Sequence, residues 1–208
     1  MVDLKNMSKK KQAEYIWDYY KLHIIGVLVI ILIAVSFIHS QATKIDYVFN
    51  LTMIGNIIDD NKKIDLEKKL TSIVVKQGEI RKQAIVDIMI PDKSNNSGAL
   101  SNEYMQKFIA MMSVGELDVI VLDKSLFDTF VKQGMFLRLD NNLNLATIKN
   151  KKIEASSSDN TKAVYAINAE NIKIFKDIGY DTNNKVIGII SSCKQVDKAT
   201  LVLKYLIK

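Results

Sequence analysis

The chain has 208 residues, of which 48% are hydrophobic and 25% charged, and its formal net charge is +6. This composition excludes a largely disordered chain. Lysine is interspersed with acidic residues after the first 21 positions, which argues against a nucleic-acid partner. Cys193 is the single cysteine, so an intramolecular disulfide and a cysteine-based zinc site are excluded.

The first feature along the chain is an apolar stretch over 22–38, LHIIGVLVIILIAVSFI, with no Asp, Glu, Lys or Arg. The hydrocarbon core of a bilayer needs about 20 apolar residues in a helix. A lone segment can pair its backbone groups in lipid only as a helix. We therefore expect a transmembrane helix over 19–40. The side chains expected at the membrane interfaces are Trp17, Tyr19, Tyr20, Lys21 and His39.

Lysine distribution predicts the orientation of this span. Five lysines precede it, and only Lys44 follows closely. The positive-inside rule places a basic tail, 1–18, in the cytoplasm. A tether, 41–46, and an extracellular domain, 47–208, then follow on the outer side of the cell membrane. A cleaved signal peptide ending at Ser40-Gln41-Ala42 is the alternative, but the apolar run is longer than a usual h-region, which favours an uncleaved signal anchor.

The rest of the chain alternates predicted strands and helices. We expect strands at 47–54, 84–90, 117–122, 163–167 and 186–191. Helices are expected at 102–114, 124–132, 169–178 and 195–207, and around the apolar stripe Leu66, Leu70, Ile73 and Val74. Residues 141–160 are polar and mixed, and 156–160 within them are predicted to form a loop. This order predicts an α/β domain with a mainly parallel sheet. The wide apolar face of 102–114 predicts a helix that is deeply buried or touches a partner.

The segment 115–140, GELDVIVLDKSLFDTFVKQGMFLRLD, resembles a segment of the extracellular solute-binding proteins of ABC importers. The matching residues are Gly115, Leu117, Asp118, Val119, Ile120, Phe127, Gln133, Gly134, Phe136 and Leu139. Residues 163–207 are similar to the returning strand, helix, strand and last helix of that fold. The N-terminal segments KKKQAEYIWDYYKLHIIGV and FNLTMIG resemble single-pass membrane proteins of Firmicutes, which are Gram-positive bacteria.

This resemblance implies a periplasmic-binding-protein-like fold with one lobe. A type II solute-binding protein has two lobes with a ligand cleft between them. Here only 141–160 stand where a second lobe would be inserted. The resemblance therefore implies a domain without a hinge or a closing cleft, which leaves open whether a small molecule binds.

Candidate ligand-binding residues follow the first three predicted strands of the domain. Ligands of open parallel sheets bind beyond the carboxyl ends of the strands, where these loops would converge. The candidates are Gly55, Asn56, Asp92, Ser94, Asn95, Asp123 and Ser125. The alternative is that these residues form turns and helix caps, and Asp123 is placed to cap the helix 124–132.

The sequence holds no catalytic or metal-binding constellation. His23 and His39 flank the span at opposite ends and cannot share a metal. Phosphate-loop, dinucleotide and nucleophile-elbow motifs are missing, and Ser94, Ser97 and Ser125 have no histidine to activate them. We expect a non-enzymatic binding or accessory subunit without a cofactor, associated with an integral membrane partner such as a transporter subunit. The alternative is an extracellular sensor or scaffold that makes protein contacts without a small ligand.

Overall fold

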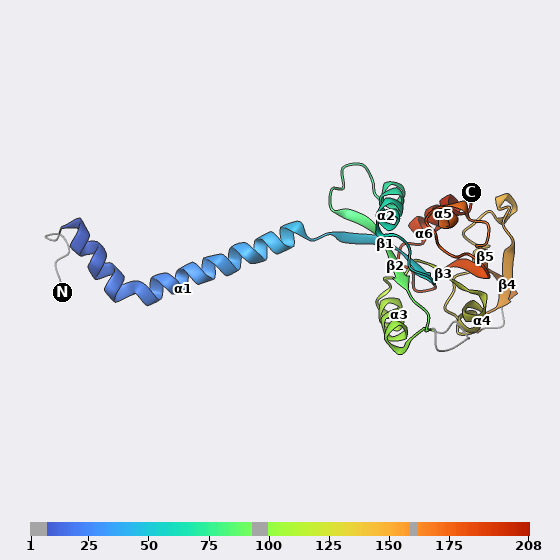
Figure 1. Cartoon of the computed structure of the whole chain (residues 1–208), viewed down its shortest axis with the longest axis horizontal. Coiled ribbons are helices and arrows are strands. Elements are labelled where there is room, and N and C mark those ends of the chain that lie inside the picture. The colour runs from blue at the N-terminus through green and yellow to red at the C-terminus, as the bar shows by residue number, and fades with distance from the viewer. Residues whose placement is uncertain (1–7, 93–99, 159–161) are drawn as a thin grey trace. The chain divides into compact units, whose positions relative to one another are not determined.

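The computed structural model describes residues 8–92, 100–158 and 162–208. The chain forms two compact units that divide between Lys44 and Ile45 (Figure 1). The first unit is a helix, and the second is an α/β domain. All buried hydrophobic residues recorded in the structure lie between Phe49 and Leu206, so the second unit has its own core.

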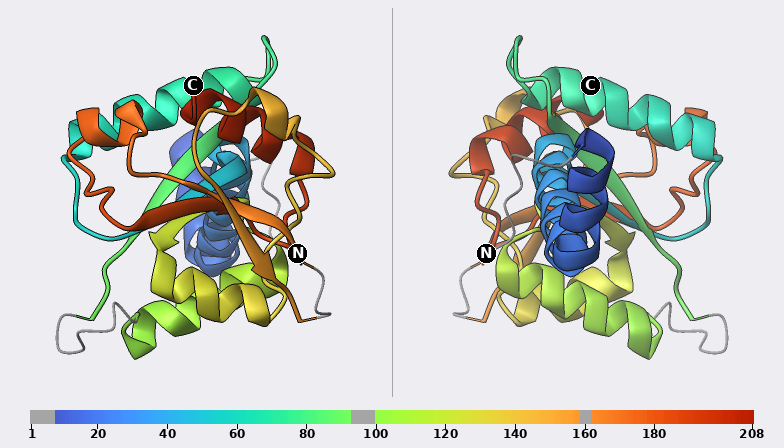
Figure 2. Two further views of the ribbon diagram at one scale, coloured as in Figure 1. Left: turned by 90° about the vertical axis from the view of Figure 1, so that its right-hand side faces the viewer. Right: turned by 90° about the vertical axis from the view of Figure 1, so that its left-hand side faces the viewer.

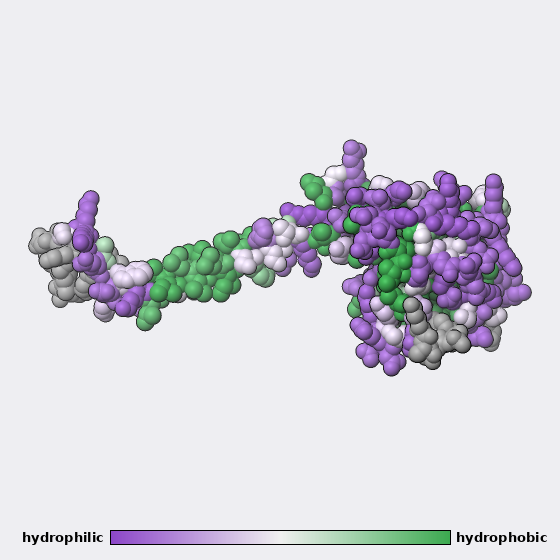
Figure 3. All heavy atoms as spheres, in the orientation of Figure 1, coloured by the Kyte–Doolittle hydropathy of each residue, from purple (hydrophilic) through white to green (hydrophobic). Residues whose placement is uncertain are grey.

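The first unit is helix α1 (Lys9–Thr43). Its segment Trp17–Thr43 is 27 residues long and strongly hydrophobic. At about 1.5 Å per residue this segment exceeds the thickness of a bilayer core. Its apolar side chains are exposed and form a continuous band in Figure 3. Within the described residues, the chain therefore has one helix long and apolar enough to cross a membrane. Only Lys44 and Ile45 separate α1 from the first strand, fewer than the predicted tether.

The second unit is built on a six-stranded sheet with the order β2-β1-β3-β6-β5-β4. The strands are β1 (Asp46–Ile54), β2 (Lys82–Met89), β3 (Val119–Asp123), β4 (Lys152–Ser156), β5 (Lys162–Asn168) and β6 (Lys185–Ile189). β1 pairs in parallel with β2 and β3, whereas β6, β5 and β4 pair with their neighbours in antiparallel fashion. The α/β class is confirmed, but the sheet is mixed and not mainly parallel.

The connections explain this mixture. Parallel neighbours need a crossover, usually a helix, that returns the chain to the starting edge of the sheet. α2 (Asp60–Val74) and α3 (Asn102–Val114) provide such crossovers between the first three strands. The segment between β5 and β6 instead begins and ends at one edge, since Asn168 pairs with Val186. The sequence elements alone do not distinguish these two kinds of connection.

Helices cover both faces of the sheet, as Figure 2 shows. One face packs against α2, α5 (Lys173–Asp177) and α6 (Val196–Leu206), and the other against α3 and α4 (Lys124–Lys132). The alternation of side chains along β1 divides the two cores. Leu51 and Met53 belong to the first core, whereas Ile54 belongs to the second. The domain is thus a three-layer α/β/α arrangement.

Two predicted features differ from the structure. Residues 141–160, where no strand is predicted, contain β4, whose alternating pattern spans too few residues to be recognised. α3 has the predicted bounds, but Phe108 is its one buried residue among those described. Of the two expected alternatives, deep burial is therefore wrong, since Ile109 and Val114 are 48% and 52% exposed, and contact with a partner stays a prediction.

Candidate functional site

The parallel strands β1, β2 and β3 end at the same edge of the sheet. A cavity of about 420 Å³ lies at this edge. Its lining residues are Gly55, Asn56, Ile57, Ile90, Pro91, Asp181 and Lys185. The volume is within the range of small-molecule sites, and the lining combines apolar walls with a few polar groups, which is the usual composition of such sites. We call this space the strand-end cavity.

Lys185 supplies a buried positive charge to the strand-end cavity. The residue is only 5% exposed, at the first position of β6. Its Nζ donates hydrogen bonds to the Ile54 carbonyl oxygen at 2.9 Å and to Asp123 Oδ2 at 2.8 Å. A buried ammonium requires such partners because desolvation of an unpaired charge is very costly. These two acceptors, within the part of the chain that the structure describes, leave the third N–H donor for a ligand oxygen.

Tyr180 lies next to Lys185, whose Nζ is 5.9 Å from the centroid of the tyrosine ring, although Tyr180 is not a lining residue of the cavity. Its hydroxyl donates a hydrogen bond to the same Ile54 carbonyl oxygen at 2.6 Å. Burial, with smaller contributions from Asp123 and Asp181, raises the pKa of Tyr180 well above its usual range. The hydroxyl therefore stays protonated and keeps donating. Gly55 is required for this close approach, since a Cβ at position 55 would lie 2.8 Å from Tyr180 Cε2.

Asn56 holds two loops of the site together. Its side-chain oxygen accepts a hydrogen bond from the Asp181 backbone N–H at 2.8 Å, and its Nδ2 donates to the Gly179 carbonyl oxygen at 2.9 Å. The loop after β1 is therefore fixed to the loop that precedes β6. Asn56 lines the cavity, but its amide is engaged with backbone groups. We assign it a positioning role at this site.

The predicted site residues are only partly brought together. Gly55 and Asn56 line the strand-end cavity, and Asp123 lies behind it as the partner of Lys185. Asp123 occupies the N-cap position of α4, as predicted, but its side chain makes no capping hydrogen bond and pairs with Lys185 instead. Ser125 is exposed on the first turn of α4 and is not a lining residue, and neither is the half-buried Asp92. Ser94 and Asn95 lie outside the described residues.

Sequence reasoning missed Lys185, Tyr180 and Asp181. They precede or open a late strand, far along the chain from the three loops in which ligand-binding residues are predicted. A lysine directly before an apolar strand, as in KVIGI, normally lies in solvent at the strand end. The sequence signal was therefore weak. The tertiary fold buries this lysine because β6 lies beside β3.

A second buried polar cluster surrounds Asp118. Its carboxylate accepts hydrogen bonds from the Asn50 backbone N–H at 2.9 Å and from Cys193 Sγ at 3.0 Å. Burial raises the pKa of Asp118 above its usual value, and burial together with Asp118 raises the pKa of Cys193 to about 12. Cys193 is therefore a protonated structural thiol, as its place after an apolar run predicts, and not a nucleophile.

The aromatic residues predicted at the membrane interface gather near the start of the apolar segment of α1. Trp17, Tyr19 and Tyr20 are exposed, and the Tyr19 and Tyr20 ring centroids lie 5.0 Å apart in an edge-to-face arrangement. Lys21 and His39 are exposed as well. These positions fit amphipathic side chains at the level of lipid headgroups, and contact with lipid stays a prediction.

Comparison with known proteins gives no relative. No protein-family model matches the chain, and no curated protein or solved structure matches it either.

Proposed function

We propose that this chain is a non-enzymatic, membrane-anchored binding subunit. Its α/β domain would take a small polar ligand in the strand-end cavity on the outer side of the membrane. The observation that carries this proposal is the buried ammonium of Lys185, which lines a cavity of about 420 Å³ at the ends of three parallel strands.

The lining residues indicate the class of ligand. The free N–H of Lys185 favours an anionic or carbonyl oxygen, and such a bond to a charged donor is stronger than one between neutral groups. Ile57, Ile90 and Pro91 provide apolar walls for a carbon skeleton. A small carboxylic acid or an amino acid would satisfy both features.

We propose further that the subunit works with an integral membrane partner such as a transporter subunit. The apolar helix α1 and the resemblance of 115–140 to a segment of solute-binding proteins support this reading. Since the domain is a single lobe, a partner protein would complete the enclosure of a ligand. The proposed accessory role follows because one lobe alone would not enclose the ligand.

A sensor or scaffold that makes only protein contacts is the second candidate. The observation that favours it is α3, where Ile109 and Val114 expose apolar side chains on a helix with little burial. Such exposed apolar side chains are available for contact with a partner protein. A domain of this kind would need no occupied cavity.

A ligand screen on the full chain in detergent tests the binding proposal. The probes are amino acids, small carboxylic acids and inorganic anions, and the readout is thermal unfolding of the α/β domain. A ligand at 100 times its Kd stabilises the folded state by about 2.7 kcal/mol. Stabilisation by at least one probe is expected, and stabilisation by none would count against the proposal.

A pair of matched variants assigns the effect to the cavity. Ile57→Trp fills the strand-end cavity from a side chain that is 71% exposed, so the fold should tolerate it. Ile80→Trp is the control, because Ile80 is 93% exposed and not a lining residue. The first variant should lose the stabilisation and the second should keep it.

Crosslinking in the native membrane followed by mass spectrometry identifies the partner. Retention of a transporter subunit supports the accessory role, whereas retention of a signalling or envelope-assembly complex supports the scaffold.

A further inference from the structure

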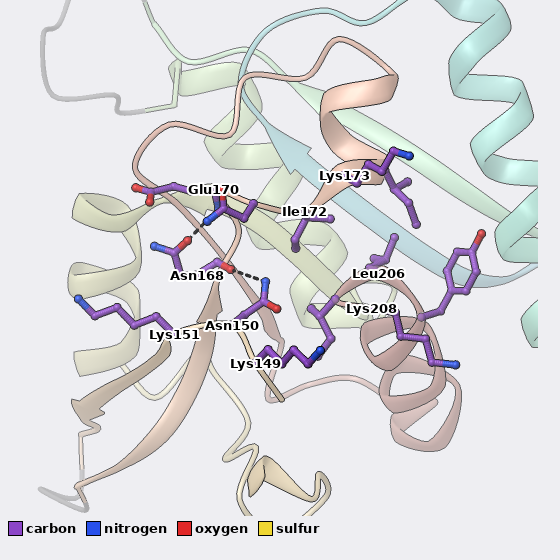
Figure 4. Close-up of a pocket in the computed structure, with 13 residues that line it drawn as sticks. Lys149, Asn150, Lys151, Asn168, Glu170, Ile172, Lys173, Leu206 and Lys208 are labelled. Carbon is purple, nitrogen blue, oxygen red and sulfur yellow. Dashed lines mark hydrogen bonds between the residues drawn. The ribbon is translucent and has the colours of Figure 1, made fainter. Parts of the chain in front are cut away.

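A basic groove of about 740 Å³ lies elsewhere on the domain and shares no lining residue with the strand-end cavity. It is formed by the segment 149–151, the residues that follow β5, and the end of α6 (Figure 4). A neighbouring hollow of about 530 Å³ shares Lys149, Asn150, Ile207 and Lys208 with it. The two hollows therefore adjoin, and we call them together the basic groove.

Positive charge is concentrated along this groove. Five lysines line it: Lys149, Lys151, Lys173, Lys204 and Lys208. Glu170 is the one acidic side chain among the described residues that line it. The whole of 45–208 holds 23 basic and 20 acidic residues. The side chains of the groove thus carry a larger excess of positive charge than the complete domain, whose remaining surface is close to neutral.

The five groove lysines make no ion pair or side-chain hydrogen bond within the described part of the chain. Other lysines of the domain are paired, for example Lys107 with Asp87 at 2.8 Å. Lysines crowded without counter-charges repel one another, and bound anions relieve this repulsion. The arrangement is therefore one that a polyanion would stabilise.

The floor of the groove is held in shape by the fold. Ile172 and Leu206 are buried beneath it. Asn168 accepts a hydrogen bond from the Glu170 backbone N–H at 2.9 Å, and Asn150 donates to the Asn168 carbonyl oxygen at 3.4 Å. In Figure 4 the labelled lysines project from different sides of this floor. Several anionic groups, rather than one, would be needed to reach them all.

We propose that the basic groove binds an extended anion that carries several phosphate groups. Lysine is well suited to phosphate because its ammonium acts as a point charge without strict geometry. The volume greatly exceeds that of one phosphate. Tyr205 is the one aromatic residue among the described lining residues, so the groove lacks the stacking platform typical of single-stranded nucleic acid binding.

Binding of short-chain inorganic polyphosphate to the full chain in detergent tests this inference. The test variant is Lys149→Gln/Lys151→Gln/Lys173→Gln. The control is Lys62→Gln/Lys69→Gln/Lys132→Gln, which removes the same charge from exposed lysines outside the groove. All six side chains are exposed, so both variants should fold.

We expect the groove variant to bind polyphosphate at least about tenfold more weakly at moderate salt, because phosphate contacts dominate such affinities. The slope of log Kd against the logarithm of the salt concentration should be smaller by about two to three in this variant. The control should change the affinity by less than about twofold, since distant exposed charges are screened. Equal loss in both variants, no binding by the unmodified chain, or equally tight binding of monophosphate would overturn the proposal.

A competition experiment distinguishes the source of the phosphate groups. Water-soluble short-chain phosphatidylglycerol is added to the polyphosphate complex, with phosphatidylcholine as the comparator. Displacement by phosphatidylglycerol alone identifies lipid headgroups as ligands of the groove. Absence of displacement identifies a soluble phosphate polymer. Both results support the assigned chemistry, and neither depends on a ligand in the strand-end cavity.

Discussion

The Lys185 ammonium lies 2.8 Å from the Asp123 carboxylate, although 62 positions separate the two residues in the sequence. The pair joins the start of β6 to the end of β3, which are antiparallel neighbours. The side chains are 7% and 23% exposed, so the pair is largely shielded from water. The same ammonium donates to the end of β1 through the Ile54 carbonyl oxygen. One lysine thus connects three strands at the edge where the cavity lies.

Lys185→Met should strongly destabilise the domain. Removing one partner of a buried ion pair leaves the other charge uncompensated, at a cost of about 3 kcal/mol in the free energy of unfolding. The double variant Lys185→Met/Asp123→Leu should recover part of that loss, because no buried charge remains. Urea unfolding of the full chain in detergent measures both values. The control Lys82→Met breaks the exposed pair with Glu79 and should have little effect.

Gly55→Ala should destabilise the domain by about 1 to 3 kcal/mol, the usual cost of overpacking. The added Cβ would meet Tyr180 Cε2 at 2.8 Å, and Tyr180 is buried and cannot move aside freely. Tyr180→Leu removes the ring and with it the clash. A double-mutant cycle from unfolding experiments should therefore show that the two substitutions are not additive. Additive effects would contradict the close approach of Gly55 and the Tyr180 ring.

Cys193 should react very slowly with iodoacetamide in the folded chain. Its pKa, raised to about 12 by burial and by Asp118, leaves about a thousandfold less thiolate near neutral pH than an ordinary thiol with a pKa of 9.0. Asp118→Asn removes a neighbouring carboxylate and should raise the rate, although less than complete unfolding in urea does. Labelling followed by mass spectrometry gives the rates. A folded chain that reacts as fast as the unfolded chain would contradict the structure.

The same thiol predicts a dependence of stability on pH. A raised native pKa means that the folded state holds the proton more tightly than the unfolded state does. Stability from this group is therefore complete below about pH 9.0 and is lost as the pH rises towards about 12. Cys193→Ala should flatten that part of the profile. Unfolding free energies at a series of alkaline pH values, compared between the two proteins, provide the measurement.

Orientation in the membrane can be tested with single cysteines in a Cys193→Ala background. Ser72→Cys, on an exposed position of α2, should be labelled by a membrane-impermeant maleimide on intact cells. Ser8→Cys, before α1, should be labelled only after permeabilisation. The positive-inside rule requires this result because the lysines precede the span. The reverse labelling pattern would contradict the predicted topology. A molecular mass that lacks the N-terminal segment would instead favour cleavage of a signal peptide.

Local sequence patterns determined several elements of this protein. α3 and α4 have the bounds predicted from their apolar spacing, and glycines at 115 and 134 follow them. The long apolar helix was equally evident from composition. Helical periodicity, helix ends and a hydrophobic span all depend on residues close together in the chain, so the sequence carries them directly.

Only the tertiary structure decided the direction of the later strands and the residues that meet in space. β6 runs antiparallel to β3, which buries Lys185 against Asp123, and Lys185 is also a lining residue of the strand-end cavity. The groove lysines likewise come from three separate segments, and their spacing along the chain gives no sign that they converge. Such arrangements arise from packing between distant segments. A local pattern determines where an element begins and ends, but the burial of its faces against the rest of the chain determines its neighbours.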